Sequence, residues 1–497
     1  MAVATRTFQN LIGGQWVDGS SGETFDTVSP ATGELLGTFP KSTRDDVDRA
    51  VAAAREAFRS WSLMPAPRRG EILFRAAEIL VERKEDLAQE MTREMGKVLA
   101  EARGDVQEAI DMVYFMAGEG RRLVGETVPA EMPDKFAMSV RMPVGVIACI
   151  TPWNFPIAIP SWKIAPALIA GNTVVFKPAS DTPLLALRLA EILQEAGLPD
   201  GVLNMVFGGG SDVGDAVATH PDVDVVSFTG SSWTGREITK RTADQLKKVT
   251  LELGGKNVIV VLNDANLDLA IDGIVWSAFG TTGQRCTAAS RVVVEEGVYD
   301  EVVERLAERA RGLTLGNGLE DSVEVGPVIN DAALQKIHSY REVGEADGAR
   351  LVAGGNIATG AGLEGGHFYE PTVWADVDPN ARIAQEEIFG PVTAVIKARD
   401  FDHAIEIANG VDFGLSSAIF TENVNRAFVA MRDLYTGICY INAGTIGAEI
   451  QLPFGGTRDT GNGHRDAGVA CLDNFTEWKS VYVDYSGTLQ RAQIDHD

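Results

Sequence analysis

Three side chains in this sequence have types that could carry out chemistry at a carbonyl carbon. Cys286 lies in the polar segment TTGQRCT at 281–287, where a helical pattern stops and no strand pattern has begun, so its thiol can face a cleft. A thiolate in a cleft could add to a carbonyl carbon. A lone cysteine is more often a small buried apolar residue, and its position alone does not decide between the two interpretations.

Glu252 and Asn154 are the candidate partners of this thiol. Glu252 closes an apolar strand pattern just before Gly254 and Gly255, so it could act as a general base at a strand's carboxyl end, or equally as a capping or ion-paired residue. Asn154 lies in PWNFP at 152–156. Its amide could donate a hydrogen bond to an oxyanion, although a buried asparagine more often satisfies backbone groups.

Other segments could bind a dinucleotide. FTGSSWTG at 228–235 ends a strand pattern and opens a helix, so Ser231 could cap the helix and free N–H groups could bind a pyrophosphate. Lys177 follows another strand pattern and could hold a ribose hydroxyl or a phosphate, or be a solvated lysine. Gly208–Gly210 with Gly214 is a weak match to GxGxxG and serves equally well as a strand-to-helix turn.

Parallel α/β structure is needed to position these segments. Apolar runs at strand length alternate with helical patterns in two blocks. The strand patterns are 144–150, 173–176, 203–207, 225–228 and 249–253 in the first block, and 291–295, 392–396, 417–420 and 439–441 in the second. The helical patterns are 43–125, 181–196, 300–312 and 402–409.

The patterns predict two Rossmann-like parallel α/β domains and a small β arm. We expect residues 1–125 and 144–254 to form the dinucleotide-binding domain and residues 255–450 the catalytic domain. Strand patterns outside these blocks seek a partner edge, so residues 126–143 and 465–497 are predicted to be an oligomerisation arm. A homo-oligomer, dimer or tetramer, is therefore expected.

Composition excludes several classes of function. The 497 residues contain 44 Lys and Arg against 70 Asp and Glu, a net charge of −26, which repels nucleic acid. No apolar stretch reaches the roughly 20 residues of a membrane span, and the start MAVATRTFQN lacks an export signal, so a cytoplasmic protein is expected. The four cysteines show no CxxC spacing, and the six histidines are scattered, so no metal site is expected.

Taken together and in this order, the motifs resemble those of the aldehyde dehydrogenase superfamily over essentially the whole chain. They are PWNFP at 152–156, KPAS at 177–180, FTGS at 228–231, LELGGK at 251–256, GQRC at 283–286, EEIFGP at 386–391 and PFGG at 453–456. The resemblance implies that Cys286 is the nucleophile, Glu252 the base, and Asn154 with the backbone N–H of Cys286 the oxyanion hole. Members that transfer the acyl group to coenzyme A tend to lack this glutamate, so a free acid is the expected product.

The resemblance also implies a set of cofactor residues. They are Thr151, Pro152, Trp153, Lys177, Ser180, Gly230, Ser231, Gly235, Leu253, Glu387 and Phe389. Members that prefer NAD tend to carry a glutamate three residues after the lysine, where this chain has Ser180. NADP should therefore be accepted beside NAD. Lys163 is expected in a proton path near Glu252 or in a structural ion pair.

The residues around Cys286 limit the range of candidate substrates. Arg285 precedes Cys286 and could receive a substrate carboxylate, or point outward to a surface partner. Arg121, Phe155 and Trp162 are the other expected substrate contacts. The GQRC form resembles dehydrogenases of dicarboxylic semialdehydes, particularly 2-oxoglutarate semialdehyde. Succinate and glutamate semialdehydes, glyceraldehyde and aliphatic aldehydes stay open, as do a cofactor-free thioesterase and a non-catalytic, crystallin-like protein.

Overall fold

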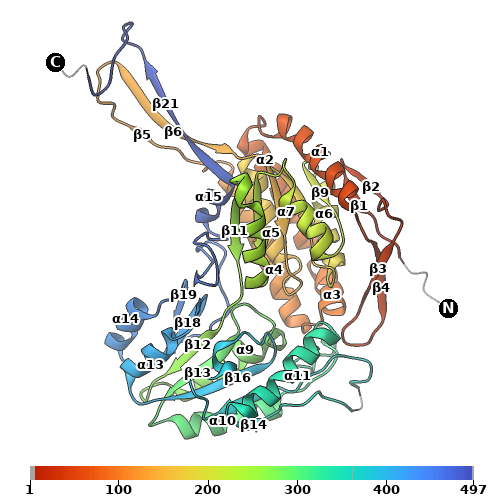
Figure 1. Ribbon diagram of the computed structural model, residues 1–497, viewed down its shortest axis with the longest axis vertical. Coiled ribbons are helices and arrows are strands. Elements are labelled where there is room, and N and C mark those ends of the chain that lie inside the picture. Colours follow the sequence, from red (N-terminus) through yellow and green to blue (C-terminus); the bar gives the residue numbers. More distant parts are fainter. Residues whose placement is uncertain (1–5, 361, 495–497) are drawn as a thin grey trace.

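A computed structural model describes residues 6–360 and 362–494 of the chain. The outermost residues of the predicted domains, 1–5 and 495–497, lie outside the described residues, as does residue 361. The chain forms two bodies, each built on a seven-stranded sheet, and a long β arm that projects from one of them (Figure 1). The predicted fold class, two parallel α/β units with a small β arm, is confirmed.

The first sheet has the strand order β11-β10-β7-β8-β9-β1-β2. Its parallel strands follow the predicted apolar runs closely, because strands buried on both faces carry few polar residues. They are β7 (Val146–Ile150), β8 (Thr173–Lys177), β9 (Leu203–Met205), β10 (Val225–Thr229) and β11 (Lys248–Glu252). An antiparallel hairpin, β1 (Asn10–Ile12) and β2 (Gln15–Val17), extends the edge, and the sequence patterns did not predict it.

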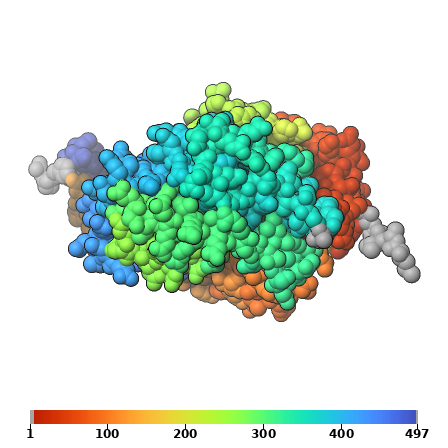
Figure 2. Space-filling model, turned by 90° about the horizontal axis from the view of Figure 1, so that it is seen from below, coloured from red at the N-terminus to blue at the C-terminus, as the bar shows by residue number. Residues whose placement is uncertain are grey.

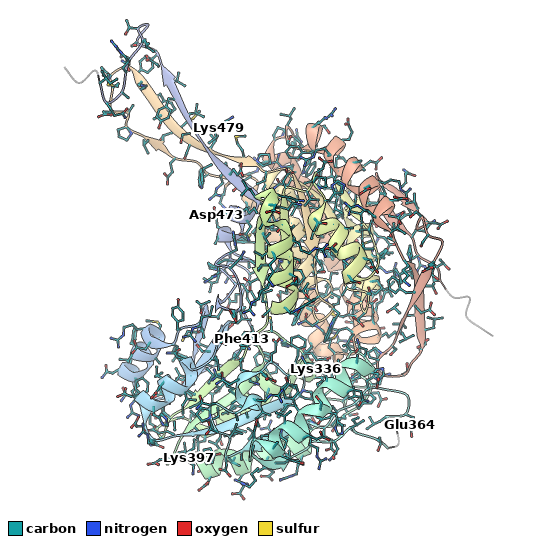
Figure 3. All side chains as sticks on the ribbon, in the orientation of Figure 1. Lys336, Glu364, Lys397, Phe413, Asp473 and Lys479 are labelled. Carbon is teal, nitrogen blue, oxygen red and sulfur yellow. The ribbon has the colours of Figure 1, made fainter. Side chains whose placement is uncertain are left out.

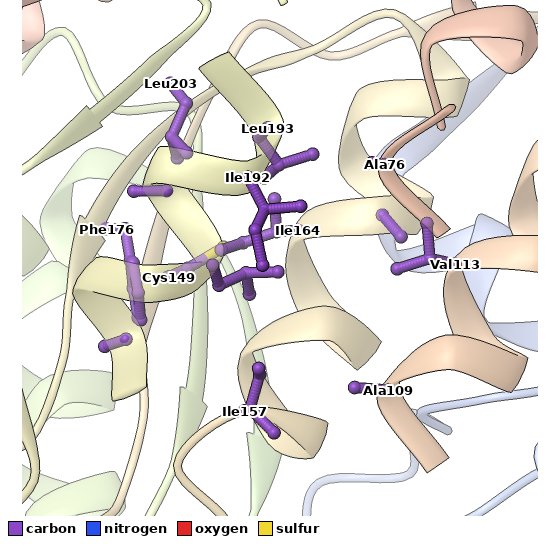
Figure 4. Packing of buried hydrophobic residues seen from close by; sticks show 14 of the residues in the cluster. Ala76, Ala109, Val113, Cys149, Ile157, Ile164, Phe176, Ile192, Leu193 and Leu203 are labelled. Carbon is purple, nitrogen blue, oxygen red and sulfur yellow. The ribbon is translucent and has the colours of Figure 1, made fainter. Parts of the chain in front are cut away.

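Helices from the N-terminal region and from the crossovers cover this sheet. They are α1 (Arg44–Trp61), α2 (Ala66–Glu82), α3 (Lys84–Met95), α4 (Leu99–Glu119), α5 (Ala158–Ala170), α6 (Pro183–Glu195), α7 (Asp215–Thr219) and α8 (Ser232–Thr242). Figure 4 shows Ala109 and Val113 of α4 near Ile157 and Ile164 around α5, within the same core as Cys149 of β7. Cys149 is fully buried among these apolar residues and is a packing residue.

The second sheet has the order β14-β15-β16-β13-β12-β18-β19, and only β14 runs antiparallel to its neighbour. Its strands are β12 (Asn257–Val261), β13 (Ala289–Glu295), β14 (Arg350–Ala353), β15 (Thr372–Ala375), β16 (Val392–Ala398), β18 (Ser416–Phe420) and β19 (Ile438–Ile441). Its helices are α9 (Leu267–Phe279), α10 (Tyr299–Gly312), α11 (Asp331–Ala346), α12 (Arg382–Gln385), α13 (Phe401–Asn409) and α14 (Val424–Asp433). Figure 2 views this body from below.

The two segments predicted as an arm pair with one another. β21 (Thr476–Asp484) runs antiparallel to β6 (Lys135–Pro143), and β5 (Thr127–Val128) completes the three-stranded sheet. Lys479 marks the arm in Figure 3. Smaller elements are the hairpin β3 (Thr24–Val28) and β4 (Leu35–Pro40), the pair β17 (Phe413–Gly414) and β20 (Thr457–Arg458), and α15 (Leu472–Phe475). Across the described ranges, no helix has both the length and the apolar character to cross a membrane.

Candidate active site

Four neighbouring strands of the first sheet end at one edge, and the predicted chemical groups follow those ends. β11 ends at Glu252, β10 at Thr229 and β8 at Lys177, while Asn154 lies in the loop that follows β7. These strands pair in parallel, so their carboxyl ends share one side of the sheet. The fold therefore brings segments that lie about 100 residues apart to one place.

A cleft of about 240 Å³ opens beside this edge, with walls from both sheets. Seven of the predicted cofactor residues line it: Pro152, Trp153, Gly230, Ser231, Leu253, Glu387 and Phe389. The remaining four do not line the cleft. The N–H of Thr151 donates to the carbonyl of Lys177, Ser180 Oγ donates to the carbonyl of Gly208, and Gly235 packs beneath Leu253. Lys336, labelled in Figure 3 on α11, adds a cation that the motifs did not indicate.

The donors around the cleft fit a dinucleotide. Helix α8 begins directly after Ser231, whose Oγ accepts from Thr234 N at 3.2 Å, and its first N–H groups can receive a pyrophosphate. Lys177 is only 5% exposed, and burial lowers its pKa to about 8. Within the described part of the chain its ammonium group has no hydrogen bond or ion pair, so a ligand oxygen would supply the missing partner. Trp153 and Phe389 meet edge to face at 5.5 Å across the cleft wall.

A second pocket of about 100 Å³ meets the cleft at Cys286, which lines both. We call it the tunnel. Of the predicted substrate contacts, Phe155, Trp162 and Arg285 line the tunnel together with Glu252. Arg121 does not line either pocket: it lies exposed in the turn after α4. A ligand in the cleft and a second ligand in the tunnel would therefore both lie beside Cys286.

Burial dominates the electrostatics of the two reactive groups. Desolvation, with Glu252 and other acids nearby, raises the pKa of Cys286 to about 12. Burial and then Asp466 raise the pKa of Glu252 well above its ordinary value, and neither of its oxygens has a hydrogen-bond partner in the described structure. Burial therefore disfavours the ionised form of both groups.

A buried ion pair lies behind Glu252. Lys163 Nζ is 2.9 Å from Asp466 Oδ2 and donates to Ser227 Oγ at 3.1 Å, and Asp466 itself lines the tunnel. The expectation of a structural ion pair for Lys163 is confirmed. Asp466 and Glu252 line the same tunnel, so the alternative in which Lys163 belongs to a proton path near Glu252 also stays open.

Glycines in two of the motifs stand where one segment touches another. A Cβ at Gly255 would come within 2.7 Å of the carbonyl oxygen of Cys286, and one at Gly455 would collide with Oε1 of Glu252. Gly455 also has a φ of +146°, which other residues rarely adopt. The LELGGK and PFGG motifs are therefore contact surfaces for the nucleophile loop and for Glu252.

Helix α4 supplies residues that sequence reasoning missed. Lys97, just before the helix, donates to Asp105 Oδ2 at 2.7 Å and to the carbonyl of Asn154 at 2.8 Å. Glu101 accepts from Thr281 N at 2.8 and 2.9 Å and pairs with Arg285 at 3.2 Å. The signal was present in the sequence, because acids at 101, 105 and 108 recur on one face of a helix whose other positions are largely apolar.

Arg285 points into the protein. Its side chain is 13% exposed, pairs with Glu101 and lies over the ring of Phe155 at 5.3 Å. The alternative in which it points outward to a surface partner is wrong. A cation therefore lies in the tunnel, beside the nucleophile in sequence.

The sequence model of the aldehyde dehydrogenase family matches residues 16–481. The chain belongs to this family and is an NAD(P)-dependent enzyme. It is 45% identical to an alpha-ketoglutarate semialdehyde dehydrogenase of Haloferax volcanii, over 96% of this chain and 99% of the relative. It is 41% identical to an alpha-ketoglutaric semialdehyde dehydrogenase of Bacillus subtilis, over 97% and 100%. An NADP(+) succinate-semialdehyde dehydrogenase of Escherichia coli is 40% identical, over 96% and 97%.

Solved structures show the same fold. Betaine aldehyde dehydrogenase from Staphylococcus aureus in complex with NAD+ superposes with a TM-score of 0.94 at 36% identity, covering 97% of this chain and 96% of that one. A putative aldehyde dehydrogenase from Burkholderia cenocepacia superposes with a TM-score of 0.95 at 37% identity, covering 98% and 99%. The resemblance seen in the motifs is confirmed.

The raised pKa of Cys286 predicts slow alkylation of this residue in the enzyme without cofactor. Iodoacetamide reacts with the thiolate, so the rate at Cys286 should rise about tenfold per pH unit from pH 7 to pH 10. Glu252→Gln should speed the reaction at any one pH, because it removes an acid that raises this pKa. The rate is measured by mass spectrometry of the Cys286 peptide. A plateau below pH 9 would contradict the prediction.

Proposed function

We propose that this aldehyde dehydrogenase oxidises the semialdehyde of a dicarboxylic acid, 2-oxoglutarate semialdehyde first among them, to the free acid. The observation that carries the proposal is the placement of Arg285 inside the tunnel that ends at Cys286. A guanidinium in a narrow pocket is suited to a carboxylate at the far end of a short substrate. The names of the relatives from Haloferax volcanii and Bacillus subtilis support the same class.

In the proposed mechanism, Cys286 attacks the aldehyde carbon. The thiol first releases its proton to water; the thiolate sulfur then bonds to the carbon, and the π electrons of the carbonyl move to the oxygen, which becomes an alkoxide. Asn154 is proposed to stabilise this oxygen, and its contact with the Cys286 loop, where Nδ2 donates to the carbonyl of Gln284 at 3.0 Å, supports this role. When bound, NAD(P)+ accepts the hydride that leaves the carbon, and a thioester on Cys286 remains.

Glu252 is proposed to activate the water that hydrolyses the thioester. The water loses a proton to the carboxylate, its oxygen bonds to the acyl carbon, and the thiolate of Cys286 leaves. A raised pKa makes the carboxylate of Glu252 a stronger base once it has ionised. We infer that the Lys163–Asp466 pair passes on the proton, and turnover limited by this step should rise with pH.

Glu252→Gln separates the two half-reactions. The variant should still release one NAD(P)H per site in a rapid burst, because thioester formation needs Cys286 and Asn154. Steady-state turnover should then fall by about 100-fold or more, because no base activates water. Stopped-flow absorbance at 340 nm measures both phases, with Cys286→Ala as the control that should lose both. Wild-type steady-state turnover in Glu252→Gln would refute the assigned role.

The rival substrates differ in charge, and the tunnel discriminates between them. Succinate semialdehyde carries a carboxylate as 2-oxoglutarate semialdehyde does, whereas aliphatic aldehydes carry no charge. Phe155 and Trp162 offer apolar walls to either kind. Only the acidic aldehydes would use Arg285, which in the described structure forms an ion pair with Glu101.

Arg285→Gln should raise the KM for 2-oxoglutarate semialdehyde by on the order of 10- to 100-fold, the cost of one charge-assisted contact. The KM for butanal should change less than about threefold. Initial rates over a panel of these aldehydes, succinate semialdehyde and glyceraldehyde provide the measurement. If butanal is the best substrate of the wild-type enzyme, the semialdehyde proposal fails.

Both cofactors are proposed to be used, with NADP accepted because of Ser180. Its hydroxyl donates to the carbonyl of Gly208 at 3.0 Å, close to the buried Lys177. A serine adds no negative charge where a glutamate would repel a 2′-phosphate. Lys177 remains available to attract that phosphate.

Ser180→Glu should therefore shift the preference towards NAD. The kcat/KM for NADP should fall by about tenfold or more relative to that for NAD, because a carboxylate and a phosphate would repel one another. Steady-state kinetics with each cofactor gives the ratio. A wild-type preference for NAD of more than a hundredfold would overturn the proposal.

The enzyme is further proposed to be a homo-oligomer. α14 exposes Val424, Phe428 and Met431, each more than half exposed, beside a groove of about 300 Å³ that reaches β19, the edge of the second sheet. The arm offers β21, another unpaired edge. A second copy of the chain would offer a strand edge that can pair with these edges and an apolar surface that can cover the groove.

Phe428→Asp should dissociate this assembly. An ionised carboxylate in an apolar contact costs several kcal/mol, so sedimentation velocity should show a smaller species. Leu63→Asp places the same charge at an 82% exposed leucine elsewhere and should leave the wild-type species. A wild-type protein that sediments as a monomer would contradict the proposal.

A further inference from the structure

Helix α4 presents three acids to the site, and one of them lacks a partner. Glu101 pairs with Arg285 at 3.2 Å, and Asp105 pairs with Lys97 at 2.7 Å. Glu108, one turn further along, lines the tunnel with Arg285 and Cys286. In the described structure its carboxyl group makes no hydrogen bond or ion pair, so it faces whatever occupies the tunnel.

The cations nearest to Glu108 already have acidic partners. Lys97 and Arg285 are two cations, and Asp105 and Glu101 are the two acids that pair with them. An ionised Glu108 together with a substrate carboxylate would place two unbalanced negative charges at a pocket of about 100 Å³. Two such groups share a proton more readily than they both ionise.

We propose that Glu108 is a specificity-determining residue whose neutral carboxyl group donates a hydrogen bond to the distal carboxylate of the substrate, beside Arg285. This inference rests on the proposed function, because it concerns the same tunnel and the same class of substrate. It assigns the substrate carboxylate two unlike contacts, a cation that neutralises charge and an O–H that donates. Because Glu108 contributes a neutral carboxyl group and not a second cation, the tunnel would favour a substrate that carries its own negative charge.

The surroundings of Glu108 favour its neutral form. Burial, followed by the charge of Asp105, raises its pKa to about 8, and Asp111 acts in the same direction. Arg285 and Lys97 act in the opposite direction. Tyr440 of β19 also faces Glu108 and has a raised pKa, so it carries no charge at neutral pH. A bound substrate carboxylate would favour the neutral form further.

The experiment compares a charged and an uncharged aldehyde across pH 6.5 to 9.5. For the wild-type enzyme, the ratio of kcat/KM for 2-oxoglutarate semialdehyde to kcat/KM for butanal should be constant to about pH 7.5. It should then fall by about tenfold per pH unit above pH 8, as Glu108 ionises. The titrations of Cys286 and Glu252 affect both substrates and cancel in the ratio.

Two variants test whether Glu108 causes the fall of this ratio with pH. Glu108→Gln keeps the size and a donor but cannot ionise, so its ratio should stay within about twofold over the whole range. Asp111→Asn removes an acid from the exposed face of the same helix, so the ratio should still fall, with its onset moved to a somewhat lower pH because Asp111 helps to raise the pKa of Glu108. Activity with butanal shows that each variant is folded.

The other possible outcomes contradict either the role of Glu108 or the proposed substrate class. A flat wild-type ratio, or a fall that persists in Glu108→Gln, overturns the role of Glu108. A higher kcat/KM for the semialdehyde at pH 7 in Glu108→Gln, with a lower one for betaine aldehyde, overturns it as well, since Glu108 would then be an anion that attracts cations. Butanal preferred at every pH would instead refute the proposed substrate class.

Discussion

The site depends on a buried ion pair that ties the helix α4 to the loop after β7. Lys97 Nζ lies between Asp105, the carbonyl of Asn154 and the ring of Phe155, whose centre is 3.9 Å away. Taking two charges out of water is costly, and only full pairing and hydrogen bonding offset that cost. Asp105 completes its bonding by accepting from Ala158 N, at the start of α5. The pair thereby fixes both the Asn154 loop and the tunnel wall at Phe155.

The same helix reaches the second body of the protein. Glu101 binds the backbone of Thr281, and both Thr281 and Thr282 have left-handed backbone angles, with φ of 52° and 57°. Such angles cost of order 1–3 kcal/mol for each residue with a Cβ and persist only where the surroundings hold them. Thr282 is held through its hydroxyl, which donates to Gly326. This strained turn leads directly to Cys286, so contacts from the first body determine where the nucleophile lies.

Burial then sets the chemistry. The groups nearest to the reaction, Cys286, Glu252 and Glu108, all have raised pKa values because water is scarce around them. Burial thus opposes ionisation of all three groups. A dry environment also strengthens each oriented donor, including Asn154, relative to its effect in water. The cleft and the tunnel share the lining residues Ile159, Thr229, Leu253 and Cys286.

The amino-acid sequence by itself determined the parallel strands of the first sheet and β13, β16, β18 and β19 of the second, because buried strands appear as apolar runs. It did not predict β12, β14, β15 or the edge hairpin of β1 and β2. It also predicted Cys286, Glu252 and Asn154 as site residues, and the structure brings their segments, which carry glycines and prolines, to one edge of the first sheet. Tertiary structure alone decided the roles of Lys97, Glu101, Asp105 and Glu108, and it left Arg121 outside the tunnel. Charged residues at helical spacing look locally like a solvated face. Only the packing of α4 against α5 and the nucleophile loop turns that face inward, and no local pattern encodes a contact between segments almost 200 residues apart.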